Sequence, residues 1–220
     1  MIDKAHKELQ NLKDIVIKMA DLAREMLDKS VLALKNQDVE LAKKIIGQNT
    51  SLENFDYEIE DLTIKILTLY QPMAKDLRFC STCLKLNTYL YRIGRYGKDI
   101  AKITINPEMS DKPHLQKLVS IPHMAEIVDS MISDAMFAFE EEDISKLDKI
   151  HFIDREESVD ALRHSIFREA MILGMEDPRN INRIANYTMI ARYLERCGDH
   201  ACKIAEKVNF MITGDRIEIN

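Results

Sequence analysis

Two stretches of this chain, 104 residues apart, decide its fold: "YLYRIGRYGKDIA" (89–101) and "YLERCGDHACKIA" (193–205). Tyrosine, leucine, arginine, glycine, isoleucine and alanine recur at the same places in both, which indicates an internal duplication. The second copy has Glu195 and Asp199 where the first has Tyr91 and Arg95. The fold is therefore expected to repeat, and the chemistry to differ between the copies.

The composition around the repeat is that of a long-helix protein. Only 6 glycines and 5 prolines occur in 220 residues, whereas sheet proteins need frequent turn residues. The net charge of −6 argues against a nucleic-acid-binding protein, which normally shows a basic face. No apolar run approaches the ~20 residues of a membrane span, and charges from Lys4 onward interrupt any leader. With 4 cysteines that read as reduced thiols, we expect a cytoplasmic protein.

Apolar spacing predicts three long helices in the first half. The first helix is expected over 3–35, where apolar residues recur at intervals of three and four: Leu9, Leu12, Ile15, Met19, Leu22 and Met26. Asp38 can cap a second helix that tolerates Gly47 and runs to about Tyr70. Pro72 suits the first turn of a third helix, which reaches about Ile105.

The same pattern restarts after a linker over 106–113. A fourth helix is expected over 114–139, a fifth ends near Gly174 and a sixth near Met211. Long antiparallel helices joined by short loops form bundles. The sequence thus predicts an all-α fold of two similar three-helix bundles, residues 1–106 and 107–220.

A set of polar side chains could converge in the second half. Residues four apart share one face of a helix, and the 104-residue offset pairs Asp56 with Asp160 and Glu60 with His164. If the fifth and sixth helices are antiparallel neighbours, one groove would hold Asp160, His164, Glu195 and Asp199. Such an oxygen-rich set with one nitrogen suits Fe, Mn, Mg or Zn. The alternative is that these are ordinary solvated charges.

Four motifs resemble those of the PhoU family, in the right order and copy number over the whole chain: "QPMAKDLR" (71–78), "LYRIGRYG" (90–97), "MEDPRNI" (175–181) and "LERCGDHA" (194–201). The resemblance implies a regulator of high-affinity phosphate uptake and, indirectly, of phosphate-starvation transcription. It also implies a homodimer without enzymatic activity. The implied partners are the cytoplasmic side of a phosphate ABC transporter and a sensor histidine kinase.

The resemblance further implies metal binding through E/DxxxD pairs on the second and third helices of each bundle. Carried over by position, the second-half ligands are those named above, and His164 departs from the family's carboxylate. Iron is the expected ion, with Zn, Mn or Mg as alternatives. In the first half we expect Arg95, with Tyr91, to form an ion pair with Asp56 and Glu60 and so to replace the metal.

Two other classes stay open at this point: a metal-free helical interaction protein and a di-metal carboxylate oxidase. The oxidase bundles use Glu-x-x-His pairs, and this sequence contains none. The cysteines fall inside predicted helices, so we expect small buried residues rather than a zinc site: Cys80, Cys83, Cys197 and Cys202. His200 is expected to face solvent or to contact one of the metal ligands.

Overall fold

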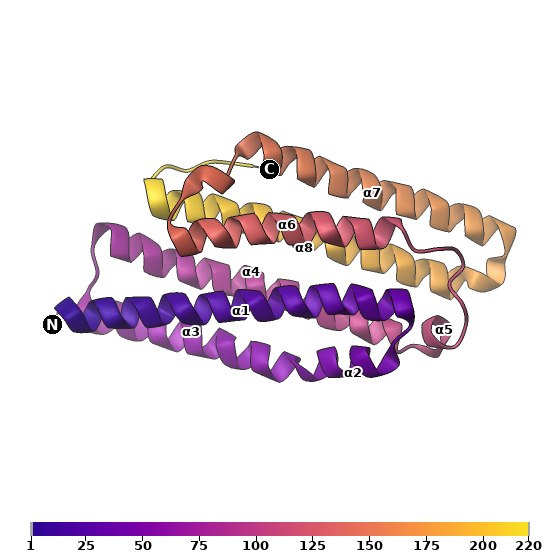
Figure 1. Cartoon of the computed structure of the whole chain (residues 1–220), viewed down its shortest axis with the longest axis horizontal. Coiled ribbons are helices and arrows are strands. Elements are labelled where there is room, and N and C mark those ends of the chain that lie inside the picture. The colour runs from indigo at the N-terminus through magenta and orange to yellow at the C-terminus, as the bar shows by residue number, and fades with distance from the viewer. Residues whose placement is uncertain (1, 220) are drawn as a thin grey trace.

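The computed structural model describes residues 2–219 of the chain, with side chains from Lys4 onward. The described residues contain helices and connections but no strand (Figure 1). The first half holds α1 (Ile2–Asn36), α2 (Val39–Gly47), α3 (Asn49–Tyr70) and α4 (Ala74–Thr104). After the short α5 (Pro107–Ser110), the second half holds α6 (Ser120–Glu141), α7 (Lys149–Glu176) and α8 (Ile181–Thr213), with 3₁₀ turns at Ile144–Lys146 and Pro178–Asn180. Two similar bundles of long helices are confirmed.

The second predicted helix is divided into α2 and α3 at Gln48. The Gln48 backbone keeps helical angles, φ −67 and ψ −13, and its N–H still bonds back to the carbonyls of Lys44 and Ile45. The division is therefore a local distortion of one long helix. Gly47 next to it has the low helix propensity expected at such a place. Asp38 caps α2 as predicted, by accepting from the backbone N–H of Leu41.

The fourth helix begins later than predicted, at Ser120 instead of 114. The preceding linker is held by side-chain bonds that an early helix would not allow. His114 bonds the Leu34 carbonyl oxygen at 2.9 Å and the Tyr187 hydroxyl at 2.8 Å. Arg183 donates to the carbonyl oxygen of Pro113. These contacts attach the linker to both bundles.

Four helices form the centre of the molecule. In Figure 1, α1 and α6 lie on the near side and α4 and α8 behind them, with α3 and α7 outside. On the near side Arg24 and Asp129 form a two-point ion pair across α1 and α6, at 2.8 and 3.0 Å. These two residues occupy nearly equivalent places in the two copies, so the axis that relates the halves passes close to this ion pair.

All four cysteines are free and buried, as the sequence predicts. Burial raises the pKa of the Cys80 thiol to about 11 and that of Cys202 to about 12. None of the described helices is both long and apolar enough to cross a membrane.

Candidate functional site

Helices α7 and α8 bring three of the predicted site residues together. Asp199 on α8 is half-buried, and its pKa is raised first by burial and then by the negative charges of Glu195 and Asp160. Helices α7 and α8 run antiparallel (Figure 1), and Arg163, three residues after Asp160 on α7, contacts Glu195 on α8. Asp160 and Glu195 thus both act electrostatically on Asp199, and the convergence of the three carboxylates on one ion stays a prediction.

Glu195 is buried, with 8% of its surface exposed, and two arginines compensate its charge. Arg163 of α7 places Nε 3.2 Å from Oε1 of Glu195, and Arg192 donates to Oε2. Both carboxylate oxygens are thus engaged by cations from two helices. Sequence reasoning missed both arginines, although Arg192 lies three residues before Glu195, the ordinary spacing of a helical ion pair.

His164 does not join the carboxylates as predicted. Its ring is exposed, and its Nε2 lies 3.1 Å from a terminal nitrogen of Arg163. Within the described side chains, no three His, Cys, Asp or Glu residues lie close enough together to hold one metal ion. The four-ligand set of Asp160, His164, Glu195 and Asp199 stays a prediction.

Glu156, which sequence reasoning missed, lies one turn before Asp160 on α7. Burial together with the charges of Glu156 and Asp199 raises the pKa of the Cys202 thiol, so both carboxylates lie near that sulfur. The signal was in the sequence, because Glu156 and Asp160 have the same four-residue spacing as Glu195 and Asp199. We call Glu156, Asp160, Glu195 and Asp199 the acidic row.

The first half aligns differently from what the 104-residue offset suggests. A Cβ on Gly94 would lie 2.6 Å from Leu52 Cδ2, and one on Gly198 would lie 3.5 Å from Val159 Cγ1. The two glycines are 104 residues apart, whereas Leu52 and Val159 are 107 apart. Helix α3 therefore matches α7 with a shift of about one turn. Glu53, not Asp56, is the first-half equivalent of Asp160.

This shift corrects the ion pair predicted for Arg95. Within the described side chains, Arg95 forms no ion pair with Asp56 or Glu60; its Nη1 donates to the Tyr91 hydroxyl at 3.3 Å. The pKa of Arg95 is raised first by that bond, and the carboxylates that contribute are Asp99 and Glu53.

Asp56 forms a hydrogen bond with a different residue of the first half, Asn87. One of its carboxylate oxygens accepts from the Asn87 amide at 2.7 Å. The predicted ion pair of Arg95 with Asp56 and Glu60 is therefore wrong. The 104-residue offset relates α4 to α8, but it does not relate α3 to α7. A cation does lie at the Asp199-equivalent position, where it bonds Tyr91 and the charges of Asp99 and Glu53 act on it.

The donor chemistry of the acidic row fits a cation. The row gathers carboxylates, and the negative charges of Glu195 and Asp160 add to burial in raising the pKa of Asp199. A hard, oxygen-preferring ion would relieve that repulsion. Asp160 and Asp199 could hold such an ion directly, and Glu195 could do so on leaving its arginines.

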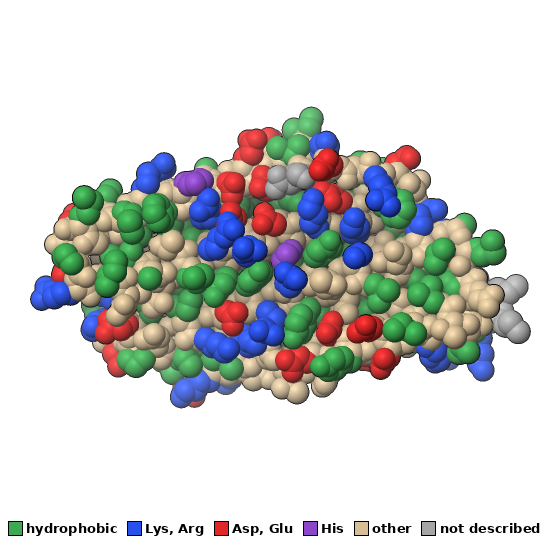
Figure 2. All heavy atoms as spheres, turned by 180° about the vertical axis from the view of Figure 1, so that it is seen from behind, with side chains coloured by type: hydrophobic (Ala, Val, Ile, Leu, Met, Phe, Trp, Pro, Cys, Tyr) green, Lys and Arg blue, Asp and Glu red, His purple; other side chains and the backbone are tan. Residues whose placement is uncertain are grey.

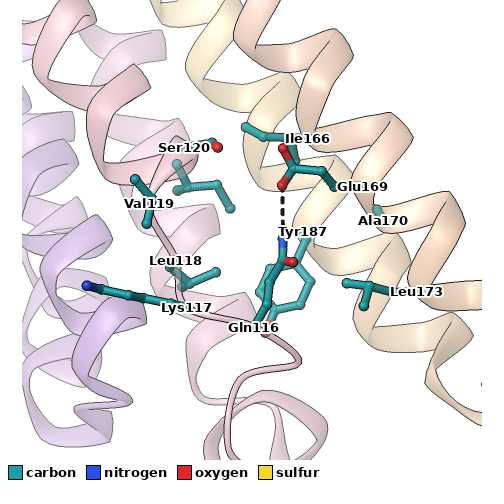
Figure 3. A pocket seen from close by; sticks show the side chains of 11 residues that line it. Gln116, Lys117, Leu118, Val119, Ser120, Ile166, Glu169, Ala170, Leu173 and Tyr187 are labelled. Carbon is teal, nitrogen blue, oxygen red and sulfur yellow. Dashed lines mark hydrogen bonds between the residues drawn. The ribbon is translucent and has the colours of Figure 1, made fainter.

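A small cavity lies beneath the linker, between α7 and α8 (Figure 3). Its volume is about 40 Å³, and a bond of 2.9 Å from Gln116 to Glu169 crosses its mouth. Substrate pockets usually measure ~300–1,000 Å³. This cavity is the size of a water site and not of a substrate pocket.

His200 is not solvent-facing, contrary to the sequence expectation. Its ring stacks with Tyr89 at 5.6 Å and with Tyr96 at 6.0 Å, both on α4. Burial, together with the charges of Arg92 and Arg196, lowers the pKa of His200 to about 4. His200 is thus part of the contact between the two bundles.

The chain matches the PhoU domain family model twice, over residues 16–104 and 121–208. It is similar to a phosphate-specific transport system accessory protein PhoU homolog of Aquifex aeolicus, with 37% identity over 88% of this chain and 86% of that protein. A Rhizobium meliloti protein of the same name is 35% identical over 94% of this chain and 86% of its own length.

Solved structures agree with these relatives. PhoU from Pseudomonas aeruginosa superposes with a TM-score of 0.88 at 28% identity, covering 96% of this chain and 99% of the other. The phosphate transport system regulatory protein PhoU from Streptococcus pneumoniae superposes with a TM-score of 0.85 at 26% identity, covering 97% and 99%. Matched twice by the domain model and along nearly its whole length by these proteins, the chain belongs to the PhoU family.

Proposed function

We propose that this protein is a cytoplasmic regulator of phosphate uptake and of phosphate-starvation signalling. The observation that carries the proposal is the presence of both PhoU domains, in a chain whose relatives are named phosphate-specific transport accessory proteins. In this role the protein acts by contact and catalyses no reaction. Its partners are the cytoplasmic side of the phosphate ABC transporter and a sensor histidine kinase.

Exposed apolar side chains support a role in binding other proteins. The outer face of α7 and α8 carries several large ones: Phe167, Met171, Ile172, Met175, Ile181 and Met189. A contiguous apolar patch on a protein surface commonly marks an interaction site. We also propose self-association as a homodimer, because such a surface is commonly covered by a partner.

Affinity capture from the native organism tests the partner proposal. The tagged protein is expected to retain the transporter and the kinase from detergent-solubilised membranes, with recoveries that differ between phosphate-rich and phosphate-starved cells. A double variant of two exposed residues on the α7–α8 face, Phe167→Ser with Met189→Ser, should reduce recovery. Equal recovery of both partners by an unrelated tagged helical protein would contradict the proposal.

A second proposal concerns the acidic row, which we propose binds a hard metal ion, with iron expected and Mn, Mg or Zn as alternatives. The support is the half-buried Asp199, whose pKa is raised by burial and then by the charges of Glu195 and Asp160. The ion would supply positive charge at the α7–α8 contact. His164, exposed beside Arg163, would have to turn toward the row to take part.

Metal analysis of the purified protein tests this proposal. Glu195→Ala with Asp199→Ala should abolish binding. His164→Ala should leave binding unchanged if three carboxylates hold the ion, and should weaken it if His164 is the fourth ligand. Retention of stoichiometric metal by the double variant would contradict binding at the acidic row. A parallel measurement of dioxygen consumption, expected to be absent, tests the alternative of a carboxylate oxidase.

A further inference from the structure

Helices α4 and α8 cross at the axis that relates the two halves, on the side opposite Arg24 and Asp129. Two ring contacts define the crossing: Tyr89 of α4 with His200 of α8 at 5.6 Å, and Tyr96 of α4 with Tyr193 of α8 at 5.3 Å. The order of these contacts shows that α4 and α8 run antiparallel here. Tyr89 and Tyr193 are equivalent residues of the two copies, as are Tyr96 and His200.

Two arginines lie between these ring contacts. On α4, Arg92 follows Tyr89 by three residues and precedes Tyr96 by four, so the three side chains share one face. On α8, Arg196 has the same relation to Tyr193 and His200. The charges of both arginines act on His200, which places both guanidinium groups near one ring. We call Arg92 and Arg196 the crossing arginines.

The crossing arginines have no ion-pair or hydrogen-bond partner among the described side chains. Both are exposed, and within the described side chains neither forms an ion pair or a hydrogen bond. Asp199, one turn from Arg196, lies outside ion-pair distance. On the other side of the molecule, the equivalent seam between α1 and α6 joins opposite charges, Arg24 and Asp129, at 2.8 Å. The α4–α8 seam thus carries two positive charges where the α1–α6 seam carries a positive and a negative one. A bound anion would compensate the crossing arginines.

More positive charge and hydroxyl groups continue along the same seam. A polar pocket borders the crossing toward the C-terminal end of α8, and its lining includes Ser81, Thr82, Lys85, Lys203, Lys207 and Arg216. Two carboxylates also line it, and one of them, Glu206, pairs with Lys203 at 2.9 Å. Figure 2, which views the molecule from behind, shows Lys and Arg side chains gathered around a histidine in the middle of this face.

We propose that the crossing arginines form a binding site for a soluble inorganic phosphate anion, either orthophosphate or a short polyphosphate. Two guanidinium groups can each present a pair of N–H donors to phosphate oxygens, and the arrangement about the axis suits an anion with equivalent oxygens. A polyphosphate would extend from the crossing toward Lys85 and Lys207.

The site does not depend on the regulatory role proposed above, because binding can be measured on the purified protein alone. Titration calorimetry with orthophosphate and tripolyphosphate, at low and moderate salt, is the test. The wild type should bind, with tripolyphosphate tighter because it carries more charge. Arg92→Gln with Arg196→Gln should weaken binding about tenfold or more, equivalent to about 1.4 kcal/mol.

Arg168→Gln, which removes an exposed arginine of α7, is the matched control and should leave the affinity unchanged. Circular dichroism checks that the double variant keeps its helical content. Equal binding by the wild type and the double variant would overturn the proposal, as would failure of the wild type to bind either anion. Binding only to vesicles containing anionic phospholipid would also overturn it, since the seam would then be a membrane contact.

Discussion

Two glycines show how closely neighbouring helices pack in each copy. A Cβ on Gly97 would lie 2.8 Å from the backbone carbonyl atoms of Met26, whereas a Cβ on Gly198 would meet nothing closer than 3.5 Å. Gly97 is therefore required where α1 and α4 approach, and the residue equivalent to it in the second copy is Ala201. The duplication preserves the helices while the packing distance between them changes.

Gly97→Ala is expected to destabilise the protein by about 1–3 kcal/mol, because backbone atoms of α1 must move away. Gly198→Ala is expected to be neutral or to stabilise by up to about 1 kcal/mol, since alanine has the better helix propensity and the space is there. Urea unfolding followed by circular dichroism measures both. Similar midpoints for the two variants would show that α1 and α4 are not as close as described.

The buried thiols give a second prediction at this scale. With the pKa of Cys80 raised to about 11 by burial, its thiolate fraction at pH 8 falls roughly 100-fold below that of a free cysteine. Alkylation by iodoacetamide should be slow in the folded protein and fast in urea, and its rate should rise with pH up to about 11. Mass spectrometry of quenched samples gives the rate. Rapid labelling of Cys80 at pH 8 without urea would contradict its burial.

At the scale of the helices, the apolar spacing and capping residues predicted most of the fold. Asp38 marks a real helix start, and the repeat predicted two bundles. The register between neighbouring helices was not predictable in the same way. The number of residues between equivalent contacts differs, because Leu52 and Gly94 are 42 residues apart and Val159 and Gly198 are 39 apart. The second copy is therefore three residues shorter between these contacts, which changes the offset from 107 to 104 without changing the periodicity of either helix.

This difference in offset explains why contacts between helices were harder to predict than positions on one helix. The charges of Asp160 and Glu195 do act on Asp199, but the convergence of the three residues on one ion stays a prediction. The partners of Arg95 and His164 depend on the register between helices, and there the predictions failed or stay open. Arg163 and Glu156 were missed for the same reason, since each acts across the α7–α8 contact.

Arg163 provides a sharp test of metal binding at this contact. If an ion takes Glu195 as a ligand, it competes with Arg163 for the same carboxylate. Arg163→Gln should then tighten Mn²⁺ binding, by about tenfold if one charged contact of about 1.4 kcal/mol is removed. Loss of the free Mn²⁺ signal in electron paramagnetic resonance measures the affinity, with Arg168→Gln as the control. An unchanged or weaker affinity in Arg163→Gln would show that Glu195 is not a ligand.

At the scale of the whole molecule, the two bundles meet through α1, α4, α6 and α8, and α7 keeps an apolar outer face. We expect a second copy to cover part of this apolar surface. Light scattering coupled to size exclusion at micromolar concentration should give twice the chain mass of 25.5 kDa. A mass of one chain over that range would contradict the homodimer.

The central claim, regulation of phosphate uptake, is tested most directly by measuring uptake of radiolabelled phosphate in cells that lack the gene. In phosphate-rich medium we expect uptake and phosphate-starvation gene expression to change together on deletion, and to return to normal when the wild-type gene is restored. Gly198→Ala should restore both, because it leaves the bundle contacts in place. Uptake and gene expression that are the same with and without the gene would contradict the account.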